Sequence, residues 1–394
     1  SVSINNAFLP QSVRDAAILA GVTTFGYGMS TIDYGRMQND ITRENMRLVG
    51  TLEGDIGSSW KWQAYYQHGR SNIDVALRNT TNNARFQLAV DAVRNGSGAI
   101  VCRSTLTNPT NGCVPANIFG TGVISPESLA YFKGTATQSQ KITENVVAIS
   151  ANGTLGNSWA GPISLAVGAE HRTERAEAVG DALSQTNGWA TGNFKTNAGG
   201  YNVTEGFGEV VVPVLKDSGL GSADLNGAVR LTHYSLAGTV TTWKAGLSYG
   251  PIPDIRIRIV RSRDIRAPSI SEGFAAGSTQ AVDVIVPNSA PNLYTPGTFR
   301  VTMVTNGNPT LTPEIADTLS LGAIFKPRFF PGFSASVDYY NIRVKDAIQQ
   351  LAQNDIVTLC YAGVSTACGL ITADGSKTIT QITRVPINVA SIRV

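Results

Sequence analysis

The sequence predicts an all-β fold, an antiparallel transmembrane β-barrel with long loops at one end, and three observations support this. Segments in which apolar and polar side chains alternate strictly recur along the 394 residues. The links between these segments are alternately short and long, as in barrels with tight turns at one end and loops at the other. Charged residues make up only 15% of the chain, while 40 residues are Gly, so the polar faces consist mainly of small neutral groups.

The alternation predicts about eleven strands. Successive side chains of a strand point to opposite faces, so each strand has an apolar side and a polar side. We expect the strands at residues 44–55, 59–71, 141–155, 162–176, 202–214, 222–236, 240–249, 254–264, 315–326, 333–346 and 384–394.

The apolar sides are expected to face lipid, where an Arg or Lys at mid-membrane would cost roughly 2–4 kcal/mol. The uncharged residues that share these sides are Trp60, Trp62, Ala64 and Tyr66; Ile163, Leu165, Val167 and Ala169; Leu319, Leu321, Ala323 and Phe325; and Phe333, Ala335, Val337 and Tyr339. Opposite them, Glu170, Arg172 and Glu174 alternate on a side that we expect to line the lumen.

Aromatic residues gather where strands meet short turns, which is typical of a girdle at the periplasmic interface. They are Trp60 and Trp62, Trp243 and Tyr249, and Phe329, Phe330 and Phe333. Cross-strand packing in a soluble sandwich is the alternative interpretation of the same residues.

The predicted strand 254–264 does not fit the scheme, because Arg256 and Arg258 lie on one side while Arg261 and Arg263 have the opposite parity. Either a β-bulge shifts the register near Val260, or one pair lies at the water interface.

The longest links are expected to be surface loops at residues 71–140, 177–201, 265–314 and 347–383. The first should contain one helix, Asn83 to Asn95, in which Phe86, Val90 and Val93 face a common surface.

The four cysteines form two local pairs, Cys102 with Cys113 and Cys360 with Cys368, and neither spacing is CxxC. Small disulfide-closed loops in an oxidising compartment explain these pairs, whereas zinc would require closer pairs and nearby His. Reduced thiols without a role remain the other alternative.

Several motifs resemble those of TonB-dependent outer-membrane receptors. RSRDIRAPSISEGF (261–274) is similar to the Arg-rich strand end and Arg-Ala-Pro of that family. GNPTLTPEIADTLSLGAIF (307–325) resembles its Gly-Asn-Pro-x-Leu-x-Pro-Glu signature, and PGFSASVDYYNIRVKDAI (331–348) follows as in the family. Segments that begin at Cys102 and Leu225 are also similar, so the resemblance covers most of the chain.

The resemblance implies a receptor of the bacterial outer membrane, embedded in its lipid. It would bind a scarce large solute, such as a ferric siderophore, a vitamin or an oligosaccharide, and import it with energy from the TonB complex. Such barrels have about 22 strands around a plug. We therefore expect residues 1–394 to form about half of a barrel, without a separate plug domain in this segment. No cofactor is implied.

Two groups of charged residues are the candidate site. Arg261, Arg263 and Arg266 lie at the end of one predicted strand. Glu314 and Asp317 lie at the start of the next one. Charge pairs between these two strands at the barrel rim would fix their register. Direct contact with a ligand is the alternative. Glu170, Arg172 and Glu174 would form hydrated ion pairs in the lumen, or contact the solute or the plug.

The chain lacks the motifs of common enzymes, including GxSxG, HExxH and the Walker loop, and we expect it not to be an enzyme. His68, His171 and His233 have no ligand spacing. Lys and Arg number 31 against 28 acidic residues, which gives no footprint for nucleic acid. The competing hypotheses are a passive or structural outer-membrane barrel without a plug and a soluble secreted adhesin or enzyme.

Overall fold

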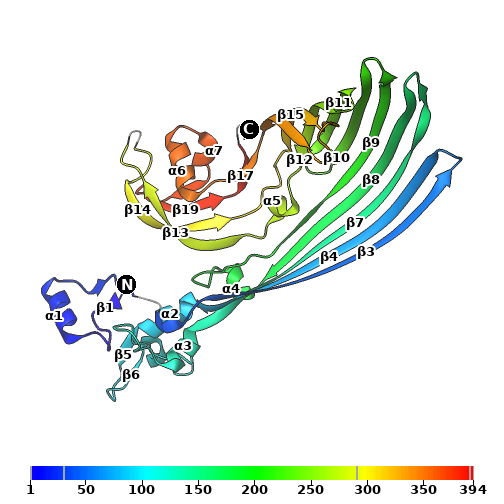
Figure 1. Cartoon of the computed structure of the whole chain (residues 1–394). Helices are drawn as coiled ribbons and strands as arrows, with labels where there is room; N and C mark the ends of the chain where they lie inside the picture. Colours follow the sequence, from blue (N-terminus) through cyan, green and yellow to red (C-terminus); the bar gives the residue numbers. More distant parts are fainter. Residues whose placement is uncertain (1, 30–31, 290–291, 390–391, 394) are drawn as a thin grey trace.

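An antiparallel sheet of eleven strands dominates the computed structural model, which describes residues 2–29, 32–289, 292–389 and 392–393. The sheet curves into a trough (Figure 1). Within this sheet, the strands pair in the order in which they occur along the chain. The remaining described strands belong to four smaller sheets. In order, the strands are β3 (Gln38–Ile56), β4 (Trp60–Thr81), β7 (Lys133–Ser158), β8 (Gly161–Gly180), β9 (Asn197–Ser218), β10 (Gly221–Tyr234), β11 (Gly238–Ile252), β12 (Ile255–Arg266), β15 (Glu314–Phe325), β16 (Ala335–Lys345) and β21 (Ile392–Arg393).

The predicted all-β fold and its strands are confirmed, although several strands have different ends. Strand β4 extends to Thr81 and strand β7 begins at Lys133. The pair therefore continues well into the predicted loop 71–140. The predicted last strand, 384–394, is interrupted: β20 (Pro386–Asn388) pairs with β17 (Ile348–Gln350), and β21 pairs with β16. Arg384 instead ends β19 (Ile379–Arg384), in another sheet.

The sheet has one apolar face and one polar face. The pairing register places the predicted lipid-facing residues on the same side, because Leu321 lies opposite Ile259 and Tyr339, and Val167 lies opposite Ala151 and Gly208. Large apolar side chains on this side are solvent-exposed in the chain, with Leu321 at 40% and Val337 at 74%. A soluble protein would bury such a surface, so this face is suited to lipid.

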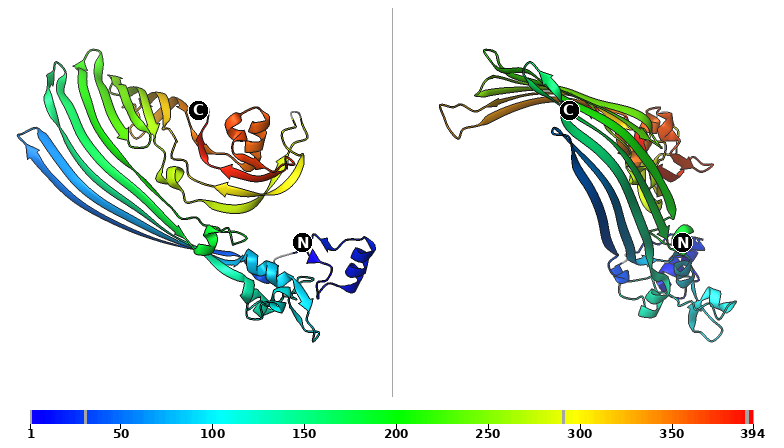
Figure 2. Two further views of the ribbon diagram at one scale, coloured as in Figure 1. Left: turned by 180° about the vertical axis from the view of Figure 1, so that it is seen from behind. Right: turned by 90° about the vertical axis from the view of Figure 1, so that its right-hand side faces the viewer.

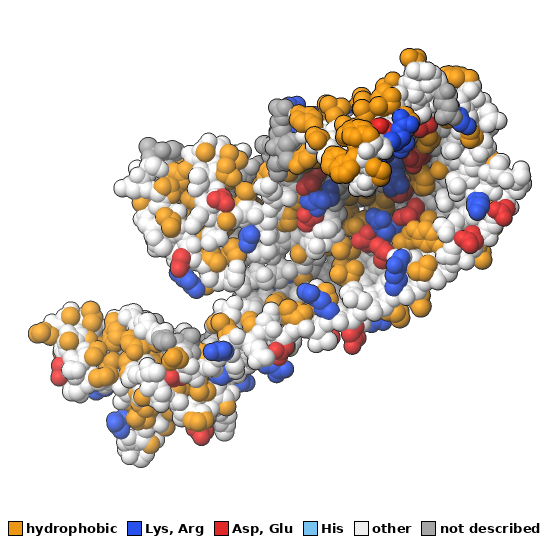
Figure 3. Space-filling model, viewed as in Figure 1, with side chains coloured by type: hydrophobic (Ala, Val, Ile, Leu, Met, Phe, Trp, Pro, Cys, Tyr) orange, Lys and Arg blue, Asp and Glu red, His pale blue; other side chains and the backbone are white. Residues whose placement is uncertain are grey.

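The polar face lines the trough. Helix α5 (Ile270–Phe274) packs against β8 and β9 and lies within the curve of the sheet (Figure 1). A Cβ at Gly199 of β9 would lie 2.0 Å from the Phe274 ring. Only glycine therefore permits this approach. In space-filling representation, charged side chains gather in the hollow of the trough (Figure 3).

Strand β12 keeps one register with β15 from Ile255 to Arg266, without a shift near Val260. The bulge, one of the two alternatives for this strand, is therefore absent from this pair. Arg256 and Arg258 point to the trough, where Arg258 pairs with Asp338 at 3.2 Å, while Arg261 and Arg263 lie on the lipid side.

Trp243 lies directly opposite Arg263, so its predicted place in the periplasmic girdle is wrong. Tyr249 stays near the short turn, where its hydroxyl donates to the Leu220 carbonyl. The height of Trp243 along β11 follows from the pairing register, on which the alternation gives no information.

A first cap is formed by residues 2–37 and 82–132, and it packs around Tyr34, Phe132 and Ala89. Its elements are β1 (Val2–Ser3), α1 (Gln11–Leu19), β2 (Thr24–Phe25), η1 (Ile32–Tyr34), α2 (Asn83–Val90), β5 (Ala92–Arg94), β6 (Ile100–Cys102), η2 (Arg103–Leu106) and α3 (Pro126–Phe132), with residues 30–31 outside the description. The Cys102–Cys113 disulfide closes one of its loops.

The predicted helix 83–95 starts at Asn83 but ends at Val90, so its C-terminal part was wrong. The Asn82 side chain accepts from the Arg85 N–H and caps the start. Residues 92–94 instead pair with β6, which buries Val93 in a small sheet. The pairing of these residues with the strand that follows thus decides the end of the helix.

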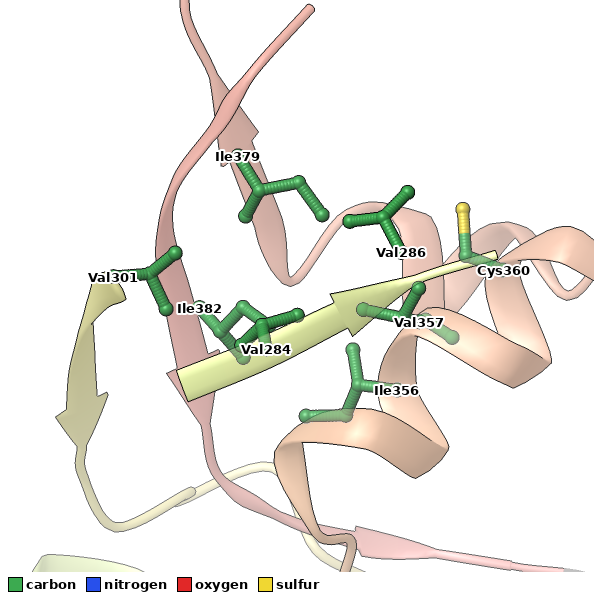
Figure 4. Packing of buried hydrophobic residues seen from close by; sticks show 9 residues of the cluster. Val284, Val286, Val301, Ile356, Val357, Cys360, Ile379 and Ile382 are labelled. Atoms are coloured by element: carbon green, nitrogen blue, oxygen red, sulfur yellow. The ribbon is translucent and has the colours of Figure 1, made fainter. Parts of the chain in front are cut away.

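A second cap lies in segments predicted as irregular loops, 265–314 and 347–383. A mixed sheet of β13 (Ser278–Val286), β14 (Gly297–Thr305), β19 and β18 (Ile371–Ala373) packs against α6 (Gln353–Tyr361) and α7 (Ser365–Cys368). Val284, Ile356 and Ile382 are buried at its centre (Figure 4). The Cys360–Cys368 disulfide joins the two helices.

Both caps lie at the opposite end of the long strands from the short turns (Figure 2). α4 (Ala182–Gln185), in the link from β8 to β9, lies near the same end. Among the described residues, we find no helix of the length and apolar character that a membrane crossing demands.

Candidate functional site: the trough wall and rim

An ion-pair ladder occupies the trough face of β8. Arg172 lies between Glu170 and Glu174, with Nε 2.9 Å from Glu174 Oε1 and Nη1 3.5 Å from Glu170 Oε1. Tyr65 of β4 donates its hydroxyl to Glu170 Oε2 at 3.1 Å. These three charges lie together because alternate residues of one strand share a face.

The ladder continues on neighbouring strands through residues that the sequence analysis did not select. Arg230 of β10 pairs with Glu205 of β9 at 3.1 Å and lies over the Phe207 ring, 5.0 Å from its centroid. On the other side of β8, Glu144 accepts from Gln67 at 2.7 Å. Their parity within each strand was visible in the sequence, but the strand register that aligns them was not.

A hollow of about 350 Å³ opens beside the ladder and is lined by residues 174–177, 198–202 and Ser235. Its lining residues include Glu174, Glu177, Arg175 and Tyr201. Carboxylate, guanidinium and phenol groups can bind a polar solute by hydrogen bonds, and the mixed charge selects neither a cation nor an anion.

The barrel rim contains a second network on the trough side. Arg266 bridges Glu272 Oε2 at 2.9 Å and Glu314 Oε1 at 2.7 Å. Glu272 also closes a capping box with Ser269 at the start of α5. Burial alone would raise the pKa of Glu272, but bonds from Arg266 and Ser269 outweigh it and hold the pKa below its usual value. The network therefore fixes α5 to the rim.

The predicted rim residues do not form one cluster, because they divide between the two faces. Arg266 and Glu314 are on the trough side, whereas Arg263 pairs with Asp317 on the lipid side at 2.9 Å. Arg261 has the parity of Arg263. Cross-strand charge pairs are therefore present on both faces. On β12 and β15, residues with even numbers face the trough and those with odd numbers face the lipid side.

A larger hollow of about 860 Å³ lies near the first cap. Its lining comes from four separate parts of the chain, residues 32–37, 79–81, 190–191 and Arg300 of β14. No sequence motif marked it, because these parts meet only in the folded chain. Within the described ranges, no three His, Cys, Asp or Glu side chains are grouped to hold a metal ion.

A curved antiparallel sheet with an apolar outer face and a charged hollow defines an outer-membrane β-barrel wall. The family model "TonB dependent receptor-like, beta-barrel" matches residues 5–392. The chain therefore belongs to the TonB-dependent receptor family, whose place is the bacterial outer membrane, and the resemblance noted from its motifs is confirmed.

One solved structure supports the fold, and two further structures are similar to this chain. A double mutant of the ferric enterobactin receptor PfeA from Pseudomonas aeruginosa has 14% identity and a TM-score of 0.51, covering 90% of this chain and 40% of that one. The siderophore receptor PirA from Acinetobacter baumannii has 14% identity, covers 90% and 41%, and has a TM-score of 0.48. The RagAB peptide importer has 11% identity, covers 79% and 31%, and has a TM-score of 0.47.

The chain thus spans about 40% of the length of the receptors it resembles. A comparison with curated protein sequences found no match. The matching family is one of receptors.

Proposed function

We propose that this chain is part of the wall and outer caps of an active-transport receptor. In the complete protein, a large solute would bind at the caps and pass along the charged trough to the periplasm. The energy would come from the TonB complex, acting on a plug domain. The observation that carries this proposal is the two-faced wall, apolar outside and charged within, in a chain that belongs to this family.

The structure of the caps supports a recognition role. Each has its own buried core and its own disulfide, so each can hold a binding surface in place above the membrane. The hollow of about 860 Å³ is large enough for a solute of drug size or above. The structural neighbours are named as ferric enterobactin, siderophore and peptide receptors or importers. We propose the same range for this chain, with a vitamin or an oligosaccharide as further candidates.

Uptake by the complete protein tests the proposal. A host strain that lacks the gene would be complemented and given radiolabelled ferric enterobactin, cobalamin, a maltooligosaccharide or a peptide, with and without functional TonB. We expect uptake of one solute to depend on both the gene and TonB. Uptake that depends on the gene but persists at the same rate without TonB would favour the passive barrel instead.

The trough ladder gives a matched pair of variants. Arg172→Gln removes the central cation between two carboxylates, so we expect uptake to fall severalfold with unchanged protein in the outer membrane. The control Arg70→Gln removes a cation from the exposed opposite side of β4, where Arg70 lies opposite Met46. If uptake fell equally in both variants, the ion-pair ladder would have no specific role in transport.

A further inference from the structure

The lipid side of β12, β15 and β16 carries a basic cluster that the transport proposal does not use. Arg261, Arg263, Arg343 and Lys345 surround a single acid, Asp317. The cross-strand rows fix their common face, because Arg263 lies opposite Asp317 and Asp317 lies opposite Arg343.

The cluster encloses a shallow hollow of about 240 Å³. Its lining consists of Arg261, Asp317, Leu319, Asn341, Arg343 and Lys345. Asp317 is engaged by Arg263 through two hydrogen bonds, at 2.9 and 3.2 Å. Among the described residues, Arg261, Arg343 and Lys345 have no acidic partner within 4.0 Å, so the hollow has an excess of positive charge.

The height of the cluster places it at the upper edge of the lipid. From Ile255 to Arg263 the strand rises about 26 Å at 3.3 Å per residue, or about 20 Å along the membrane normal at a tilt of about 40°. Below the cluster, the same face carries only uncharged residues on the three strands, including Ile257, Leu321 and Val337. An apolar band is about 25 Å tall, and the exposed Phe329 and Phe330 extend it below Ile255, so Arg263 lies near its upper edge.

Two neighbouring features agree with that height. Trp243 lies opposite Arg263, and tryptophan favours the boundary between lipid and water. Along the same face, His171, Thr204, His233 and Thr239 form one cross-strand row of polar groups. The outer surface therefore changes from apolar to polar at this level.

We propose that this cluster binds the phosphate groups of an anionic lipid of the outer leaflet, with the acyl chains along Leu319 and Leu321. Guanidinium groups match phosphate oxygens with paired hydrogen bonds, and the adjoining apolar band receives the chains. The long side chain of Arg261, one residue pair below Arg263, can extend upward to the headgroup. The phosphate supplies the charge that the hollow lacks.

The test measures binding of fluorescent diphosphorylated lipid A to the intact receptor in detergent micelles. We expect Arg261→Gln/Arg343→Gln to weaken binding at least about tenfold, since two charge-assisted contacts are lost. The control Lys216→Gln/Lys326→Gln removes two exposed cations near the short turns and should leave the affinity unchanged. Circular dichroism would verify that each variant is folded.

Competitors identify the source of the phosphate. Dephosphorylated lipid A should bind at least tenfold more weakly, and inorganic phosphate should compete only at far higher concentration, because it lacks acyl chains. Unchanged affinity in the double variant, equal binding of the dephosphorylated lipid, or inorganic phosphate as effective as the lipid would each overturn the proposal.

Discussion

Adjacent residues of β15 give a direct test of the two-faced wall, because they point to different surroundings. Leu321 faces the lipid side and is paired with Ile259 and Tyr339, while Ser320 faces the trough between Val260 and Tyr340. We predict that Leu321→Arg strongly destabilises the folded receptor, whereas Ser320→Arg changes its stability by no more than about 0.5 kcal/mol, as a surface substitution does.

The magnitude follows from the position of Leu321 in the membrane. It lies four residues above Phe325, about 13 Å along the strand and about 10 Å in height. The exposed Phe329 and Phe330 extend the apolar band below that point, so Leu321 is close to the middle of a band about 25 Å tall. An Arg there costs roughly 2–4 kcal/mol, which is about a 30- to 700-fold change in the folding equilibrium.

The assay is urea-dependent unfolding of the intact receptor in phosphatidylcholine vesicles, followed by tryptophan fluorescence. We expect a lower midpoint for Leu321→Arg at an unchanged slope, and a midpoint close to wild type for Ser320→Arg. If the two variants were equally unstable, or if Leu321→Arg were neutral, the assignment of lipid and lumen faces would be wrong.

Three further predictions concern the parts around the wall. Gly199→Val should displace Phe274 and expose α5 to limited proteolysis. The control Gly208→Val should not, because a Cβ at Gly208 meets no atom within 4 Å. Equal cleavage of the two variants would argue against the close approach of Phe274 to Gly199. Cys360→Ser/Cys368→Ser should cost the second cap roughly 2.5 kcal/mol of chain entropy for its short ring. The expected result is faster chymotryptic cleavage of residues 353–373, and a cleavage pattern identical to wild type would contradict this. Burial alone would raise the pKa of Asp181, but hydrogen bonds from Ser184, Thr137 and Trp189 outweigh it and lower the pKa. Its contribution to local stability is thus present above the unfolded pKa of about 3.9 and is lost as pH falls through the lower folded value. The loop 181–196 should open only in acid, by hydrogen exchange, and Asp181→Asn should remove that dependence.

The sequence by itself determined the fold class, the strand positions and the two faces of each strand. The reason is that a membrane wall separates two solvents, so every strand must repeat the same period-two pattern, which is readable locally. The disulfide pairs were readable for a similar reason, since each joins cysteines that are close along the chain.

Only the tertiary structure decided what depends on register and on partners distant in sequence. Arg261 and Arg266 looked like one rim group, yet they face opposite sides, because β12 has no bulge that could bring them together. The height of Trp243 in the wall was unknown until its pairing with Arg263 fixed it. The caps appeared as loops because their strands are short and their cores are assembled from separate segments, as when Val284 meets Ile356 and Ile382. Such contacts gain their free energy only after distant parts of the chain have met, so no local pattern records them.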